Sequence, residues 1–223
     1  MSFFDQLKNE TEQEKRALLS SPIIVQAMNG TLILDEYVAF LSQAYHHVKH
    51  TVPLLMAVGS RLPENYEWLR EAIAEYIEEE LGHQEWVLND IAACGFNKEA
   101  VRTSDPIAST ELMVSYAYDM AQRINPIGFF GMVHVLEGTS IAVADKAADG
   151  ILSALSLPKN AFSYLYSHGS LDQDHVKFFA GLMNKIEDPT EQTLIIHTAK
   201  MFYRLYGDIF RSLSAHHGIP LTA

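Results

Sequence analysis

The sequence has a single cysteine, Cys94, so no disulfide can form within the chain, as is usual for proteins of a reducing cytoplasm. Basic residues are also few: 16 Lys and Arg stand against 28 Asp and Glu, giving a net charge of −12. This balance argues against nucleic-acid and membrane partners, because both need a basic surface. No apolar run reaches the roughly 18 residues that span a bilayer. The N-terminus, MSFFDQLKNETEQEK, lacks the pattern of a signal peptide, so we expect a cytoplasmic protein.

What the chain does contain is helical periodicity. Its 223 residues are 48% hydrophobic, and apolar side chains recur every three to four positions. We predict an all-α fold, a single domain over residues 1–223, with about seven helices joined by short connections. The expected helices cover residues 2–20, 64–93, 109–125 and 126–149. A further helix starts at residue 35 and is kinked or ended by Pro53, another is opened by Pro158 with an interruption near Gly169, and a last helix runs to residue 213. Residues 97–106 are expected to form a polar loop.

Ionisable residues fall on apolar helix faces at three places. In the expected helix 64–93, Glu80 lies in the middle of an apolar stripe and His83 at its edge, while Glu78 and Glu79 point away. The alternative for this Glu-x-x-His run is a plain acidic surface with a boundary histidine.

The stretch IGFFGMVHVLEGTSIAVA is apolar or small around its whole circumference, which indicates a central, buried helix. Its only ionisable residues are His134 and Glu137. A buried carboxylate needs a metal, a cation or a hydrogen-bonded protonated state. The alternative for Glu137 is a structural pair with a Tyr or His. His134 could be an extra metal ligand, a group that supports a ligand or a core histidine, and we favour the last two roles.

The segment HGSLDQDH places His168, Asp172 and His175 in one narrow sector of a helix. Residues three or four apart stand on adjacent turns, about 5–6 Å apart at Cβ, so their side chains could meet at one or two ions. The alternative is a set of buried, hydrogen-bonded polar groups.

Together these positions give three carboxylates and three imidazoles on three helices: Glu80, His83, Glu137, His168, Asp172 and His175. Nitrogen and oxygen ligands without thiolate suit Fe, Mn or Zn. Six ligands exceed the need of one ion that also binds substrate, but they suit two ions about 3.5–4 Å apart. The pattern differs from ferritin-like di-iron bundles, which use two Glu-x-x-His motifs.

With these residues in view, the chain resembles the heme-oxygenase-like superfamily, which includes thiaminase II and pyrroloquinoline quinone synthase. The resemblance runs through AYHHVKHTVPLL, IEEELGHQEW, HVLEGTS and HGSLDQDHVKFF. It is strongest to the iron-dependent oxidases and oxygenases of this superfamily. It implies two Fe per chain, O2 as co-substrate, the six residues above as metal ligands, and oxidation of a small amine, amino acid or other carboxylate metabolite.

The sequence departs from the pattern of these relatives on one side of the site. Some relatives carry a glutamate at the position of Tyr76, and others take a carboxylate from the helix that here holds His46, His47 and His50. Glu80 is the best candidate by helix face, and His47 is a candidate extra ligand. The central helix lacks the thiaminase II cysteine, and the first helix lacks the proximal histidine of a heme oxygenase.

The substrate pocket is expected between the second and last helices, with Lys49, His50, Tyr76, Tyr203 and Arg204 as candidate substrate-binding residues. The alternative function is a metal-free, thiaminase II-like enzyme or a binding protein for a small heterocycle. In that case Phe129, Phe130, Phe202 and Tyr206 would stack on a flat ligand. The resemblance also allows a homodimer and an electron-donor protein as partners.

Overall fold

The computed structural model describes residues 1–215, apart from the side chains of 168–175, 214 and 215. Within that part of the chain all regular structure is helical, which confirms the all-α prediction. The elements are α1 (Phe3–Leu19), α2 (Pro22–Asn29), α3 (Leu34–Val48), α4 (Thr51–Arg61), η1 (Glu64–Tyr66), α5 (Glu67–Glu80), α6 (His83–Ala93), α7 (Lys98–Arg102), α8 (Ala108–Asp119), η2 (Met120–Ile124), η3 (Pro126–Phe129), α9 (Phe130–Leu155), η4 (Lys159–Ala161), α10 (Ser163–Met183) and α11 (Pro189–Ala215).

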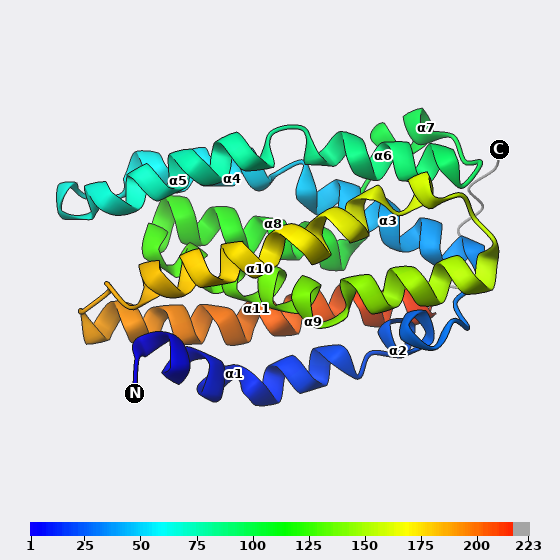
Figure 1. Ribbon diagram of the computed structural model, residues 1–223. Helices are drawn as coiled ribbons and strands as arrows, with labels where there is room; N and C mark the ends of the chain where they lie inside the picture. Colours follow the sequence, from blue (N-terminus) through cyan, green and yellow to red (C-terminus); the bar gives the residue numbers. More distant parts are fainter. Residues whose placement is uncertain (216–223) are drawn as a thin grey trace.

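The long helices run along a common direction and form a bundle around α9 (Figure 1). α9 packs against α10, α11 and α2, while α3 packs on α6 and α4 on α5. In the view of Figure 1, α1 and α2 lie along one edge of the bundle and α4, α5 and α6 along the opposite edge. The central position expected for the helix with His134 and Glu137 is therefore confirmed.

The stretch from Pro126 to Leu155 is long and apolar enough to cross a membrane by length and composition, but 56% of its most apolar 18-residue window is buried inside the protein. The central helix of a bundle is apolar because most of its surface packs against other helices. Its apolar character is thus accounted for by packing.

Gly150 was expected to end the central helix, but α9 continues through it to Leu155. The presence of glycine at position 150 is explained by α2, a helix that the sequence did not predict. A Cβ atom at position 150 would lie 2.3 Å from the carbonyl oxygen of Ala27. Glycine is therefore needed here for the close approach of the α2 backbone to α9, and it does not serve as a helix stop.

Two other expected helices are broken. The chain expected to be helical over 64–93 is interrupted at Leu81 and Gly82, where Gly82 has a φ of +91°. The helix before it breaks at Lys49 and His50, as expected from Pro53, because a proline ring clashes with the carbonyl four residues earlier. The polar loop 97–106 contains the short helix α7, and α10 has no interruption in its described backbone near Gly169.

Candidate metal and substrate site

A pocket with an empty volume of about 720 Å³, the main pocket, lies against α9 in the middle of the bundle. It is bounded by residues of α3, α4, α5, η3, α9, α10 and α11. That this space is the substrate pocket expected along the second and last helices stays a prediction. The lining residues are His47, Val48, Thr51, Leu54, Leu55, Tyr76, Glu80, Phe129, Met132, Val133, Leu136, Glu137, Ser140, Tyr164 and Tyr206. Two carboxylates from different helices, those of Glu80 and Glu137, thus face one largely apolar space.

Glu137 lies next to Tyr76, whose phenol is buried. Burial raises the pKa of Tyr76 most, and the neighbouring Glu137 carboxylate raises it further. The phenol therefore stays protonated at neutral pH. A pairing with a tyrosine is the structural alternative considered for Glu137.

Glu80 and His83 lie together although a helix break separates them. The Nδ1 atom of His83 is 3.0 Å from Oε2 of Glu80, and only 3% of the His83 side chain and 14% of the Glu80 side chain are exposed. The imidazole also stacks on Trp86, with ring centroids 3.9 Å apart. The left-handed backbone at Gly82 starts α6 directly at His83, so the turn between α5 and α6 sets the position of the imidazole beside the carboxylate.

The neighbouring acids behave as the helix periodicity predicted. Glu78 and Glu79 are exposed, whereas Glu80 is partly buried and reaches the pocket. Because the three acids are consecutive, this difference follows from the 100° turn between successive helix positions.

The described part of the chain supplies only part of the predicted ligand set. Within it, no three His, Cys, Asp or Glu side chains lie close enough together to hold a metal ion. The side chains of His168, Asp172 and His175 lie outside the described residues, so this ligand row stays a prediction. The donors that are described, two carboxylates and an imidazole, match the nitrogen and oxygen ligands that iron accepts.

Helix α10 itself is firmly placed beside the pocket at both ends of the predicted row. Tyr164 lines the pocket, and the ring of Phe178 lies 5.6 Å from that of Tyr76. The fully buried Asp90 of α6 accepts hydrogen bonds from the backbone N–H of Ser163, at 3.1 Å, and of Tyr164, at 2.9 Å. A carboxylate at the N-terminus of a helix satisfies free N–H groups and complements the helix dipole. The sequence analysis did not identify this role of Asp90.

His134 lies on the opposite side of α9, toward α1. Its Nε2 atom is 3.2 Å from Oγ1 of Thr11, whose hydroxyl donates to the Leu7 carbonyl at 2.7 Å. Thr11 must therefore accept, so Nε2 of His134 carries the proton. Burial, followed by the charges of Lys15 and Lys8, lowers the pKa of His134 to about 4. His134 is thus a neutral, hydrogen-bonded core histidine.

A second cavity, with an empty volume of about 630 Å³, lies between α1 and α9. His134 and Tyr203 line it together with Lys8 and Lys15, and Glu137 lines it as well. Burial raises the pKa of Tyr203, and the charges of Glu12 and Glu14 add to this effect. The Glu137 carboxylate therefore stands between an apolar pocket and a more polar cavity.

The remaining candidate residues are scattered. His47 is buried and lines the main pocket, with its ring 5.7 Å from that of Tyr206. Lys49 Nζ lies 3.2 Å from Nδ1 of His46, and His50 Nδ1 lies 3.1 Å from the hydroxyl of Tyr118 on α8. Arg204 is exposed. Of the substrate-binding candidates only Tyr76 lines the main pocket.

The aromatic candidates for stacking also separate. Phe129 and Tyr206 line the main pocket, whereas Phe130 and Phe202 are fully buried in the hydrophobic core. Tyr164 completes the aromatic wall but was not among the sequence candidates. The apolar residues around it gave no signal that distinguishes a pocket wall from a core.

Comparisons with known proteins agree with this architecture. The model of a heme-oxygenase-like family described as iron-containing redox enzyme matches residues 38–207. No curated protein sequence matches the chain significantly. Among solved structures, a domain of unknown function with a heme oxygenase-like fold from Shewanella denitrificans has a TM-score of 0.84 at 22% identity, covering 96% of this chain and 93% of that one.

More distant structures share the same fold. A TenA homolog from Pseudomonas syringae has a TM-score of 0.80 at 12% identity and covers 96% of this chain and 93% of its own. A heme oxygenase from Leptospira interrogans has a TM-score of 0.74 at 18% identity, with 95% of this chain and 100% of that chain covered. At these identities the likeness establishes the fold.

Proposed function

The chain belongs to the heme-oxygenase-like family of iron-containing redox enzymes, and from this premise we propose that it is a non-heme di-iron oxidase or oxygenase. Its substrate is a small amine, amino acid or other carboxylate metabolite, and O2 is the co-substrate. The observation that carries the proposal is the placement of Glu80 and Glu137, from two helices, on one pocket, with His83 against Glu80.

Glu80, His83 and Glu137 would hold iron together with His168, Asp172 and His175 of α10. The row follows Tyr164 at one-turn intervals in the sequence, and Tyr164 lines the pocket, which supports the inclusion of α10. Three carboxylates offset most of the charge of two divalent ions. Two bound irons supply the activation of O2, which these side chains cannot provide themselves.

The other residues of the pocket have supporting tasks in this proposal. Tyr76 lies next to Glu137 and would orient its carboxylate. Leu54, Leu55, Met132 and Leu136 exclude water from the pocket, which strengthens the electrostatic interactions inside it. His47 lies within the same lining and is the candidate for an extra ligand.

The test is anaerobic Fe(II) titration of the purified chain, followed by admission of O2. We expect about two irons per chain and an O2-dependent visible absorption band, consistent with the two-metal sites of other proteins. Glu137→Ala and His175→Ala should each lose iron binding. The matched control is Glu78→Ala, since Glu78 is an exposed acid two residues from Glu80. Equal iron binding in Glu137→Ala and Glu78→Ala would refute the assignment.

A second candidate function is a metal-free enzyme or binding protein for a flat heterocycle. The rings of Phe129, Tyr164 and Tyr206 on the pocket wall favour it, because aromatic faces stack on planar ligands. Acid–base chemistry by Glu137 would then replace redox chemistry. Absence of iron binding and of any O2-dependent band in the wild-type chain would favour this alternative. An electron-donor protein and a homodimeric state are further proposals, which reductase-coupled turnover and sedimentation would test.

A further inference from the structure

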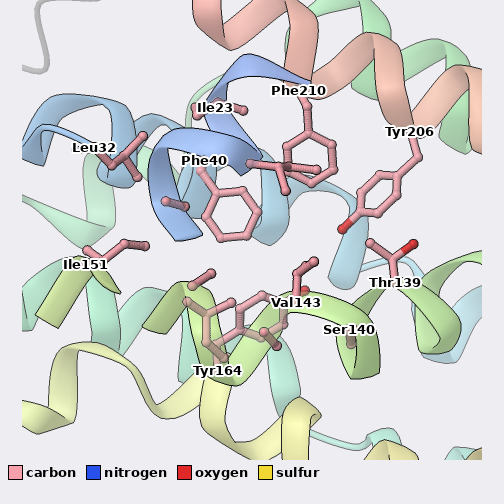
Figure 2. A pocket seen from close by; sticks show the side chains of 15 residues that line it. Ile23, Leu32, Phe40, Thr139, Ser140, Val143, Ile151, Tyr164, Tyr206 and Phe210 are labelled. Atoms are coloured by element: carbon pink, nitrogen blue, oxygen red, sulfur yellow. The ribbon is translucent and has the colours of Figure 1, made fainter. Parts of the chain in front are cut away.

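The cavities along α9 differ in polarity. The apolar pocket, with an empty volume of about 640 Å³, lies between α2 and α9. Figure 2 shows Phe40 and Phe210 on one side of it, and Val143 and Ile151 of α9 on the other. In the described structure none of its lining residues is charged, and its polar groups are the hydroxyls of Thr139, Ser140, Tyr164 and Tyr206. The second cavity, between α1 and α9, is lined instead by the charged residues Lys8, Glu12, Lys15 and Glu137.

One face of α1 turns polar side chains toward the second cavity. Lys8, Thr11 and Lys15 line it and follow one another at intervals of three and four residues, which places them on one side of the helix. Thr11 fixes this face against α9, because its Oγ1 atom lies 3.2 Å from Nε2 of His134. After burial, the charges of Lys15 and Lys8 contribute most to the lowered pKa of His134, so both ammonium groups act on the interior of the cavity.

The charged groups of this cavity differ in their pairing. Lys8 Nζ lies 3.0 Å from the carboxylate of Asp5, and half of the Lys8 side chain is exposed. Glu12 is paired with Arg16 at 3.3 Å. Lys15 is only partly exposed, and it forms no ion pair or hydrogen bond with any residue that the structure describes. The ammonium of Lys15 is therefore a positive charge available to a ligand.

A buried phenol faces the same space. Tyr203 of α11 is 2% exposed and lines the cavity, and its hydroxyl would lie 3.9 Å from a Cβ at Gly138, another lining residue. This hydroxyl has no hydrogen-bond partner in the described part of the chain. Burial raises the pKa of Tyr203, so its O–H stays protonated and can donate. Because a buried donor without an acceptor is costly, the phenol indicates that an acceptor occupies the cavity.

The neighbouring carboxylates limit the charge of such an acceptor. Those of Glu12 and Glu14 act on the Tyr203 phenol, and Glu137 lines the cavity. A phosphate dianion would meet these like charges with the ammonium of Lys15 to offset them. A carboxylate carries one negative charge and two acceptor oxygens, which match one ammonium and one phenol.

We propose that the second cavity is a binding site for a small carboxylate, held between the ammonium of Lys15 and the hydroxyl of Tyr203. The site lies on the α1 side of Glu137, apart from the main pocket. It goes beyond the proposed function, because it needs no iron. The carboxylate belongs either to a free small acid or to a longer molecule whose other end reaches Glu137, and both sources present the same group to the two donors.

Calorimetric titration of the full-length, metal-free chain tests the site. The probes are acetate, butanoate and inorganic phosphate at constant ionic strength. We expect saturable binding of one carboxylate per chain and weaker binding of phosphate. Lys15→Met should weaken butanoate binding by about tenfold or more, and Tyr203→Phe by about five- to tenfold, since each removes a hydrogen bond to a charged group.

Two further variants serve as controls. Lys146→Met removes the same charge from an exposed position of α9 outside the cavity lining, and it should change butanoate affinity by less than about twofold, because salt screens distant exposed charges. Lys15→Arg keeps a charged donor, so it should restore most of the affinity that Lys15→Met loses. Circular dichroism melting curves confirm that all variants are folded.

A bifunctional probe separates the two sources of the carboxylate. 4-Aminobutanoate differs from butanoate by a terminal ammonium, which would pair with Glu137. Tighter binding of 4-aminobutanoate by about fivefold or more, lost in Glu137→Gln, would assign the site to a longer molecule that reaches Glu137. Equal affinities of the two probes would assign it to a free small acid.

Three results would overturn the inference: no saturable carboxylate binding, equal affinities in Lys15→Met and Lys146→Met, or tighter binding of phosphate than of either carboxylate. Iron uptake is measured separately. Carboxylate binding without iron uptake would therefore support this site while refuting the di-iron function, and iron uptake without carboxylate binding would do the reverse.

Discussion

A Gly150→Ala substitution should destabilise the protein, although alanine is the better helix former. Gly150 lies inside α9, where its Cβ would be 2.3 Å from the Ala27 carbonyl oxygen and 3.3 Å from the backbone nitrogen of Gly30. Both obstacles are backbone atoms, so no side-chain rotation relieves the contact. Helices α2 and α9 must move apart, and the pocket that they enclose must change with them.

The magnitude follows from two opposing terms. Overpacking costs about 1–3 kcal/mol, and a backbone obstacle at this distance belongs at the upper end of that range. Alanine recovers about 1 kcal/mol of helix propensity relative to glycine. We therefore expect a net loss of about 2 kcal/mol in the free energy of unfolding. For a chain of this size, this corresponds to a decrease of roughly 4–8 °C in Tm.

Gly181→Ala provides the matched control. Gly181 is an exposed residue of α10, and a Cβ there would meet no heavy atom within 4 Å. Only the propensity term remains, so the variant should gain up to about 1 kcal/mol. Urea unfolding at 25 °C, followed by circular dichroism, measures both variants under the same conditions. If Gly150→Ala proved as stable as the wild type, the close contact between α2 and α9 would be wrong, and with it the fixed wall of the apolar pocket.

Three further predictions concern buried polar groups. Thr11→Val should cost about 1–3 kcal/mol in urea unfolding because it leaves the Nε2–H of His134 without an acceptor, while Thr11→Ser should retain most of the stability. The free energy of unfolding should fall as the pH drops from about 6.5 to 4, because His134 takes up a proton in the unfolded state but stays neutral in the folded state, where its pKa is lowered to about 4. His134→Gln should reduce this pH dependence, measured by urea unfolding, by up to about 3 kcal/mol. Asp90→Ala should lower Tm and iron retention together by loosening the start of α10, whereas Asp90→Asn, which keeps an acceptor, should lower both less.

The sequence predicted those features that depend on local periodicity. Glu80 could be separated from Glu78 and Glu79 because consecutive helix positions turn by 100°, and the structure confirms that only Glu80 reaches the pocket. The buried course of α9 followed in the same way from its apolar circumference. These inferences need no knowledge of which helices are neighbours.

Features that depend on contacts between distant segments could not be predicted. Gly150 was interpreted as a helix end because glycine favours such ends, and only the approach of α2, more than 100 residues earlier in the chain, explains its place inside α9. The partner of His134 is Thr11, 123 residues away. The break at Gly82 was hidden because apolar periodicity continues across it from α5 into α6.

The arrangement along α9 links these observations. His134 faces α1. Glu137 lines both the main pocket and the second cavity, which lies between α1 and α9. Ser140 lines the main pocket and also the apolar pocket between α2 and α9. One rigid, mostly buried helix therefore fixes the distance between the carboxylate and the hydrocarbon-lined space.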